Sequence, residues 1–425
     1  MTARLLPPAP ESPTGLQQQW KYDEEVDIDA DIVPRQRSSI AQPPLGFPEF
    51  IDGPKNWSGC EPGRNRGQIL TLSNANICEI CNGLHTFNGR ELDGDEVRRE
   101  LFRVPTLEGH LKQATIAILN GSGIFIIRGL RWEDYSIEDR IVIFLGLASH
   151  IGDQRGVQNS KGDMLSHIIE SKAWTVPKEK RHGIHTSDRL PFHNDMGCEI
   201  LSMQIRDRAD AGGHTCVASM TAIYNDLRQS NPWVLHVLAK PNWPIQTSSK
   251  KDPPFVLCPL MEYHDDNLVI SMDPARIGPH PLARYGSIPD LTPGQEEALA
   301  VLQRTAEKHQ MKLETQPGDI VFINNLSLLH ARESYEDGTS SSRHLVRLWL
   351  RNTELGWRIP PAMKMPWDAA FGDRAAKVVN RHYPIMPMPE YMECKYSNGT
   401  AAFVADDNFS DSSSDEVVTK VGEDG

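Results

Sequence analysis

Short apolar segments separated by turn-forming residues constrain the fold of this chain more than any other feature. Between residues 193 and 290 such segments alternate with Gly, Pro, Asn and Asp, a pattern typical of antiparallel strands. Further strands are predicted at Ile124–Arg128, Ile320–Asn324 and Arg343–Arg351. We therefore predict a β-sandwich or jelly roll of the α+β class with flanking helices.

Helix signals place helical regions around these strands. Residues 94–119 have helical character, interrupted by a Val-Pro pair, and a further helix begins after Ser136, which can cap it. Another runs from Thr292 to about Gln310, because proline follows the threonine and glutamine comes three residues after it. No GxGxxG motif follows a strand, so a Rossmann fold is not indicated.

The net charge of −13 lies almost entirely at the two ends. Residues 1–32 hold seven acidic and two basic side chains, and residues 406–425 hold seven and one. We expect a disordered, Pro-rich and acidic tail over 1–45, a single domain over 46–395 and a disordered acidic tail over 396–425. Nucleic acid is not an expected partner because no basic stripe exists.

Neither a signal-peptide stretch nor an apolar run of membrane-spanning length occurs, so we predict a cytoplasmic protein without a membrane partner. The seven cysteines are then expected to be free thiols. Cys78 and Cys81 form a CxxC motif followed by His85. A zinc or redox site is one interpretation, but zinc needs further ligands at a recognisable spacing, and an ordinary structural role is favoured.

A His-x-Asp motif at His193 and Asp195 is the first chemically informative feature. In extended backbone, residues i and i+2 point the same way, so both side chains can reach one metal ion. A third ligand from a distant strand would complete the two-histidine, one-carboxylate face that suits non-haem Fe(II) with open positions for a cosubstrate and O₂. A satisfied core histidine is the alternative for His193. The second such motif, at His264, reads as a polar hairpin tip.

Two downstream segments extend this pattern. An apolar strand leads to His330, for which a purely structural strand-end role is the alternative. In Arg343–Arg351, the odd-numbered residues, three of them arginines, share one face and the apolar residues share the other. Arginines facing the interior would need anionic partners, whereas on an edge strand they would lie in solvent. His309 and His344 are poorer metal-ligand candidates, since they lie on a helix and on the apolar face.

Four segments together resemble the TauD/TfdA family of Fe(II)/2-oxoglutarate-dependent dioxygenases, in a fungal-type branch. They are FHNDMG, the glycine turn and threonine of Ala211–Thr215, GDIVFINNLSLLHAR and RHLVRLWLR, in the family's order. The resemblance covers about residues 97–355 and implies a double-stranded β-helix, the cupin-like jelly roll. The Pro- and Lys-rich stretch 240–254 and the acidic tails depart from the family pattern.

The resemblance also implies site roles. His193, Asp195 and His330 would be the catalytic iron ligands, Thr215 and Arg343 would bind the far carboxylate of the cosubstrate 2-oxoglutarate, and Arg347 would meet an anionic substrate.

The implied activity is oxidation of a C–H bond of a small organic substrate, with formation of succinate and CO₂. The presence of Asp195 argues against a halogenase. Two alternatives stay open on sequence alone: a non-catalytic metal-binding or interaction protein of the same fold, and an iron oxidase or lyase that does not use 2-oxoglutarate.

Overall fold

The computed structural model describes residues 42–59, 68–159, 161–246, 255–279, 288–378 and 380–391. The expected tails therefore lie outside the described residues, except for 42–45. The Pro- and Lys-rich stretch is described only up to residue 246. The prediction of a single domain over 46–395 stays a prediction.

The larger sheet joins segments from the whole length of the chain, in the order β1-β2-β14-β6-β17-β3, with β4 also paired to β17. Its strands are β1 Gln68–Thr71, β2 Ile124–Arg128, β3 Gln154–Arg155, β4 Leu165–Ile168, β6 Ile200–Asp207, β14 Ile320–Asn324 and β17 His344–Arg351. All pairs except β1–β2 are antiparallel. Strands distant in sequence thus lie side by side, as crossover connections require.

The second sheet has the order β13-β8-β15-β5. Its strands are β5 Leu190–His193, β8 Thr215–Ser219, β13 Met311–Lys312 and β15 Leu328–Arg332. An apolar cluster between the sheets takes Ile126, Leu201 and Val321 from the larger sheet, and Val217 and Leu328 from the smaller. Two antiparallel sheets packed face to face confirm the predicted jelly roll.

Three strand pairs lie outside these sheets. They are β9 Trp243–Gln246 with β10 Phe255–Cys258, β11 Met261–His264 with β12 Asn267–Ile270, and β7 Ala211–Gly212 with β16 Tyr335–Glu336. The β11–β12 pair is the hairpin predicted around the second His-x-Asp motif. Its tip residues Asp265 and Asp266 have φ values of 48° and 61°, the left-handed turn conformation that Asp tolerates.

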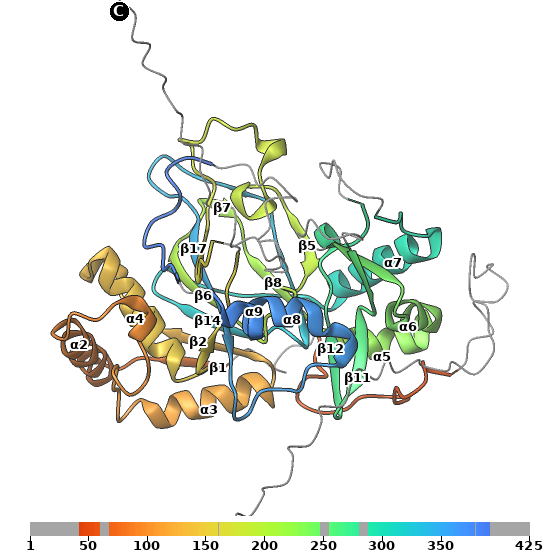
Figure 1. The fold of residues 1–425 in the computed structure, drawn as a ribbon, viewed down its shortest axis with the longest axis horizontal. Coiled ribbons are helices and arrows are strands. Elements are labelled where there is room, and N and C mark those ends of the chain that lie inside the picture. The colour runs from red at the N-terminus through yellow and green to blue at the C-terminus, as the bar shows by residue number, and fades with distance from the viewer. Residues whose placement is uncertain are drawn as a thin grey trace, which may run out of the picture.

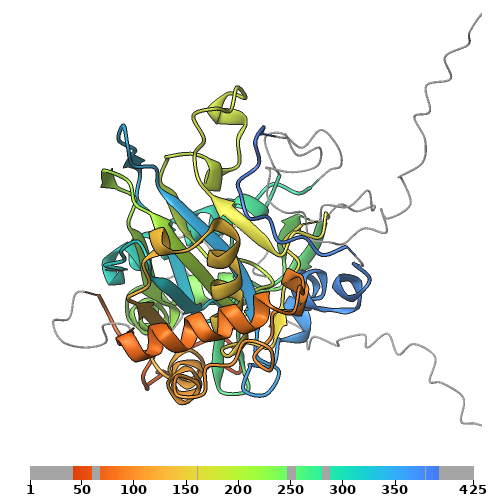
Figure 2. The same ribbon diagram turned by 90° about the vertical axis from the view of Figure 1, so that its left-hand side faces the viewer.

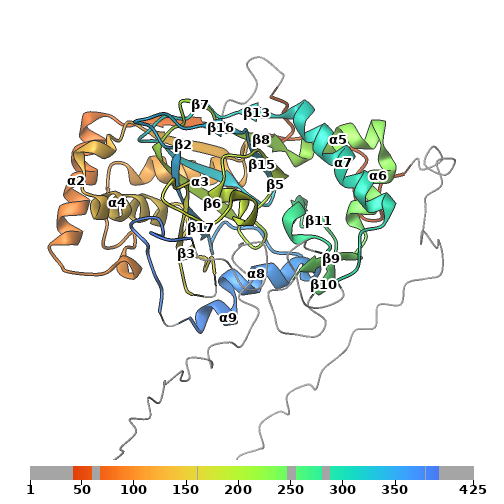
Figure 3. The ribbon, with the colours of Figure 1, turned by 90° about the horizontal axis from the view of Figure 1, so that it is seen from above.

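Helices cover both outer faces of the sandwich (Figures 1 and 3). On the larger sheet lie α2 Asn74–Asn88, α3 Glu108–Leu119 and α4 Ile137–Ser149, which share an apolar cluster with it and stand in front of the strands in Figure 2. On the smaller sheet lie α5 Met220–Ser230, α6 Pro232–Ala239 and α7 Pro293–His309.

The C-terminal part adds α8 Lys364–Phe371 and α9 Asp373–Ala376. Short 3₁₀ helices are η1 Gly94–Glu96, η2 Trp132–Asp134, η3 Lys178–Lys180, η4 Gly183–His185, η5 Pro274–Arg276 and η6 Pro361–Met363. The helices that the structure describes are too short or too polar to span a bilayer.

The helix-start predictions agree with the structure at two caps. Ser136 accepts a hydrogen bond from the Asp139 backbone, and Thr292 forms a capping box with Gln295. The expectation of strands throughout 193–290 is wrong for α5 and α6. In α5 the buried Met220, Ile223, Tyr224 and Leu227 follow helical spacing, which outweighs the nearby turn residues.

Residues 94–119 are less helical than the sequence predicts. They form η1 and α3, and the segment between these two elements is not helical. The Cys78–Cys81 motif lies on α2, where Cys78 is exposed and Cys81 Sγ lies 3.6 Å from the Tyr135 hydroxyl.

Candidate metal centre and cosubstrate site

The smaller sheet brings His193, Asp195 and His330 together. His193 ends β5 and lies opposite His330 in the β15–β5 register, so the two rings approach to 4.2 Å between centroids. One ligand atom from each of the three residues lies within 4.8 Å of the others. Within the part of the chain that the structure describes, no other group of His, Cys, Asp and Glu side chains has this geometry.

Hydrogen bonds leave particular atoms of these three residues available to a metal. His193 Nδ1 donates to the Pro191 carbonyl at 2.8 Å, which leaves Nε2 as the nitrogen with a lone pair. Asp195 Oδ2 accepts from Trp349 Nε1 at 2.7 Å and lies 3.0 Å from Arg347 Nη1. Asp195 Oδ1 instead faces His330 Nε2 at 3.8 Å, too long for a hydrogen bond.

His330 is 9% exposed, and neither of its ring nitrogens hydrogen bonds to a described residue. Buried polar atoms normally have partners, so a histidine of this kind is unusual as a structural residue. As a metal ligand it is not unusual, because a bound cation takes the place of the missing partner. The donor set, two imidazoles and one carboxylate, therefore fits iron.

The protonation states also fit metal binding. Burial would raise the pKa of Asp195, but Arg347, His330 and His193 outweigh it and lower that pKa to about 2. Burial and the neighbouring His193 lower the pKa of His330 to about 3, against the opposing effect of Asp195. At neutral pH the carboxylate is thus charged and the imidazole neutral, the forms that coordinate metals.

Two asparagine side chains fix the loop that carries Asp195. Asn194 Nδ2 donates to the Ile270 and Asn325 carbonyls, and Asn194 Oδ1 accepts from the Met272 backbone. Asn325 Oδ1 accepts from the Asp195 backbone at 2.9 Å, and its Nδ2 donates to the Asp195 and Cys198 carbonyls at 2.7 Å. The loop is therefore held in place by hydrogen bonds within the protein itself.

The glycine of the FHNDMG segment has a steric role. Gly197 has a φ of 88°, and a Cβ there would lie 2.3 Å from the Pro366 carbonyl oxygen, just before the middle of α8. A residue with a side chain would therefore be strained and would push the loop away from α8.

Arg343 lies immediately before β17 and is 5% exposed. Its Nε donates to the Gly213 carbonyl at 2.9 Å, while its Nη1 is buried without a hydrogen-bond partner. Within the described ranges it has no carboxylate partner, and burial and the nearby Arg332 lower its pKa to about 9. Because a buried, unpaired guanidinium is costly, this position fits the carboxylate of a bound cosubstrate.

The glycine turn before Thr215 makes room for this arginine. Gly213 has a φ of 71°, and a Cβ there would lie 2.9 Å from Arg343 Cδ and 3.0 Å from Tyr335 Cβ. Thr215 begins β8 and is 7% exposed. The structure thus places the threonine and the arginine of the sequence prediction at the same end of the sandwich.

Arg347 contacts the metal-ligand group directly. Besides lying 3.0 Å from Asp195, it donates through Nε to Gln158 Oε1 at 2.9 Å and lies over the Trp349 ring. The predicted substrate contact is therefore also a neighbour of the metal ligands.

For three further side chains of the site, Trp349, Gln158 and Arg276, the sequence predicts no specific role. Trp349 lies on the same face of β17 as Arg347, and only this placement could have indicated its hydrogen bond to Asp195. Gln158 and Arg276 carried no signal. Arg276, at the end of η5, is 9% exposed, and burial lowers its pKa while the charges of Asp273, Asp195 and Arg347 act on it.

The rival histidines lie elsewhere. His309 Nε2 lies 2.6 Å from Asp226 Oδ2, and His344 Nε2 lies 2.8 Å from His167 Nδ1. Neither is part of the metal-ligand group.

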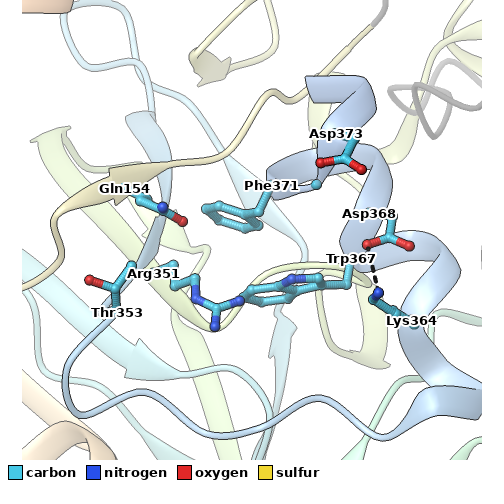
Figure 4. A pocket seen from close by; sticks show the side chains of 9 residues that line it. Gln154, Arg351, Thr353, Lys364, Trp367, Asp368, Phe371 and Asp373 are labelled. Carbon is cyan, nitrogen blue, oxygen red and sulfur yellow. Dashed lines mark ion pairs between the residues drawn. The ribbon is translucent and has the colours of Figure 1, made fainter. Parts of the chain in front are cut away.

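A cavity of about 500 Å³ lies beside α8, at the end of β17 (Figure 4). Arg351 lies over the Trp367 ring at 4.7 Å, and that ring stacks on Phe371. None of the predicted metal or cosubstrate residues lines this cavity, so it lies apart from the chemically informative side chains.

Comparison with known proteins supplies independent information. The family model described as "Taurine catabolism dioxygenase TauD, TfdA family" matches residues 89–349. The taurine hydroxylase-like protein SAT17 of Stachybotrys chartarum is 35% identical over 327 residues, covering 74% of this chain and 83% of that protein. The FR-33289 synthase of Streptomyces rubellomurinus is 27% identical over 252 residues, covering 57% and 73%.

Solved structures show the same fold at low sequence identity. An asparagine oxygenase in complex with Fe(II), 2S,3S-3-hydroxyasparagine and succinate has a TM-score of 0.53 and 15% identity, covering 67% of this chain and 93% of that one. The non-heme iron oxygenase OrfP in complex with Fe has a TM-score of 0.50 and 14% identity, covering 70% and 98%.

Proposed function

Because the chain belongs to the TauD/TfdA family of Fe(II)- and 2-oxoglutarate-dependent dioxygenases, we propose that His193, Asp195 and His330 are its iron ligands. The enzyme oxidises a C–H bond of a small organic substrate and forms succinate and CO₂ from 2-oxoglutarate. Family membership favours this activity over the non-catalytic and cosubstrate-independent alternatives. The observation that carries the ligand assignment is the convergence of the three side chains from two segments that are far apart in the sequence.

When bound, iron with 2-oxoglutarate and O₂ supplies the oxidising chemistry, and the protein supplies position and exclusion of water. Asp195 uses Oδ1 toward the metal, since Oδ2 already accepts from Trp349 and contacts Arg347. His193 uses Nε2, because its Nδ1 proton is committed to the Pro191 carbonyl. Asn194 and Asn325 hold the loop in the conformation that presents the carboxylate.

Arg343 and Thr215 bind the far carboxylate of 2-oxoglutarate in this proposal. The buried, unpartnered Nη1 of Arg343 supports the role, because only an anion offsets the cost of burying that charge. The threonine hydroxyl is a neutral donor and makes a smaller contribution.

The substrate in this proposal is a small anion. Arg347 and Arg276 place two guanidiniums around Asp195, and each feels the charge of that carboxylate. Taurine, which appears in the family description and in the name of one relative, is an aminosulfonate and carries an anionic sulfonate group that an arginine could bind. A cytoplasmic location and the absence of nucleic-acid and membrane partners remain predictions from the sequence.

The test uses full-length protein loaded with Fe(II) and supplied with 2-oxoglutarate, O₂ and a panel of small sulfonates and carboxylates. Succinate release that rises with one of these compounds supports the proposal. His193→Ala should abolish it, whereas the matched variant His264→Ala, in the second His-x-Asp motif, should leave it unchanged. Equal activity of the wild type and His193→Ala would overturn the ligand assignment.

A further inference from the structure

Arg332 lies on the same face as the predicted site residues. It follows His330 by two residues on β15, and it lies opposite Thr215 in the β15–β8 register. Residues two apart on one strand, and residues directly opposite on antiparallel strands, point to the same side of a sheet. Arg332 therefore faces the interior of the sandwich, where it is 4% exposed.

The hydrogen bonds of Arg332 leave most of its guanidinium unused. Nη2 donates to the carbonyl oxygens of Gly183, at 3.1 Å, and Asp188. Nε and Nη1 are buried and have no hydrogen-bond partner among the described residues. A purely structural role would need only the hydrogen bonds of Nη2. It does not account for the burial of Nε and Nη1.

Arg332 and Arg343 lie around one aromatic ring. The Cζ atoms of the two arginines lie 5.2 and 5.5 Å from the centroid of the Tyr335 ring. The Tyr335 hydroxyl is also buried, and no residue that the structure describes hydrogen bonds to it. Three side chains thus bring four unpartnered donors into one region: two nitrogens of Arg332, one of Arg343 and the Tyr335 hydroxyl.

The charge in this region is not compensated by a direct ion pair. Neither arginine forms a salt bridge with a described carboxylate. The acids that act on Arg332, Asp188 and Glu170, do so over longer distances. Two like charges buried side by side destabilise each other, and an anion between them would remove that penalty.

We propose that Arg332 and Arg343 together hold the far carboxylate of 2-oxoglutarate, with the Tyr335 hydroxyl as a further donor. This inference rests on the proposed function, which assigns that carboxylate to Arg343 and Thr215 alone. It adds a second cosubstrate-binding arginine, two residues after the metal ligand His330. A site with two guanidiniums selects 2-oxo acids with an anionic end over those with a neutral end.

The test measures binding to the full-length, Fe(II)-loaded protein by anaerobic calorimetry. The probes are 2-oxoglutarate and 2-oxopentanoate, which keeps the 2-oxo acid end but replaces the far carboxylate with a methyl group. Arg332→Gln should weaken 2-oxoglutarate by about 10- to 100-fold, as for loss of a charged hydrogen bond, and 2-oxopentanoate by less than about twofold. Equal effects on both probes, or none, would overturn the inference.

Two further variants separate this inference from the proposed function. If Arg343→Gln leaves 2-oxoglutarate binding unchanged, the proposed cosubstrate site itself is wrong. If Arg343→Gln weakens binding and Arg332→Gln does not, only the role of Arg332 fails. Arg206→Gln is the matched control. Arg206 is a part-buried arginine on β6 that donates to the Ile385 carbonyl, and it lies on the face of the strand opposite to the interior residue Ile205.

Arg332→Lys keeps the inference testable if the glutamine variant does not fold, which thermal unfolding would reveal. Lysine keeps the charge but cannot hold the two backbone carbonyls and a carboxylate at once. We expect at least about threefold weaker 2-oxoglutarate binding, with 2-oxopentanoate unchanged. Wild-type affinity for 2-oxoglutarate in this variant would contradict the proposal.

Discussion

The loop that carries Asp195 and the region around Arg343 are built in opposite ways. In the loop, the side-chain amides of Asn194 and Asn325 are bonded to backbone groups on neighbouring segments. Around Arg343, buried donors of three side chains have no hydrogen-bond partner in the described part of the chain. The first region is complete without a ligand, whereas the second becomes electrostatically satisfied only when an anion binds. If the proposed function is correct, the protein itself fixes the position of the Asp195 ligand, and the bound cosubstrate would supply the anion that the second region lacks.

The largest effect is expected from Asp195→Asn. The variant removes the anionic ligand and also leaves Arg347 without its carboxylate partner. We expect Fe(II) affinity to fall by at least about 100-fold, beyond the effect typical of groups that only support a ligand. Anaerobic Fe(II) titration measures this, with Asp266→Asn in the second motif as the matched control. Unchanged affinity in Asp195→Asn would show that the loop does not carry a metal ligand.

Asn325→Ala tests whether the loop is fixed by its own hydrogen bonds. The change removes three of them and leaves buried backbone groups unpaired, so the free energy of unfolding should fall by about 3 kcal/mol. Fe(II) affinity should also fall by about 10- to 100-fold. Denaturant unfolding and metal titration of the same preparation provide the measurement. A loss of stability without a loss of Fe(II) affinity would mean that Asn325 does not position Asp195.

The hydrogen-bonded region also contains Glu199, a carboxyl group whose ionised form is destabilised by burial. Its carboxyl accepts from the backbones of Asn352 and Trp357 at 3.0 and 2.6 Å, yet burial raises its pKa to about 7. A folded pKa above the ordinary 4.5 means that the folded state binds this proton more tightly than the unfolded state does. Its contribution to stability is therefore full below about pH 4.5 and is lost as the pH rises through about 7.

The loss from Glu199 amounts to at most about 3 kcal/mol. Denaturant unfolding of the metal-free protein at pH 5 and pH 8 measures it, with Glu199→Gln for comparison. The wild type should lose more stability between these two pH values than the variant does. The same pH dependence in both proteins would mean that Glu199 is ionised throughout.

The smallest effect is expected from Thr215→Ala. A neutral hydroxyl that donates to a carboxylate contributes less than a guanidinium, so the KM for 2-oxoglutarate should rise by about two- to tenfold with little change in kcat. Thr215→Ser, which keeps the hydroxyl, should restore the wild-type KM. An alanine variant with the wild-type KM would remove Thr215 from the site.

The sequence predicts the regular parts of this molecule well. The strand Ile124–Arg128 has the predicted bounds, and the alternation in residues 343–351 separates the interior Leu345 and Trp349 from Val346 and Leu348 on the helix-covered face. Local periodicity suffices in such cases because one strand faces two different environments. Local periodicity gives the wrong prediction for α5 and α6, because the turn residues near these helices are also typical of connections between strands.

The contacts between segments could not be predicted in the same way. Asp195 contacts Arg347 and Trp349, which lie on β17, far from Asp195 in the sequence. Which of them meet depends on strand crossovers, which no local pattern encodes. The four unpartnered donors near Tyr335 likewise depend on the three-dimensional surroundings of each atom, which no sequence pattern shows.

The most direct test is a crystal structure of the full-length protein prepared without O₂ and soaked with Fe(II) and 2-oxoglutarate, with iron located by anomalous scattering. We predict one iron bound by His193, Asp195 and His330, with the far carboxylate of 2-oxoglutarate within hydrogen-bond distance of Arg343. An iron bound by other residues, or a carboxylate that points away from Arg343, would contradict this account.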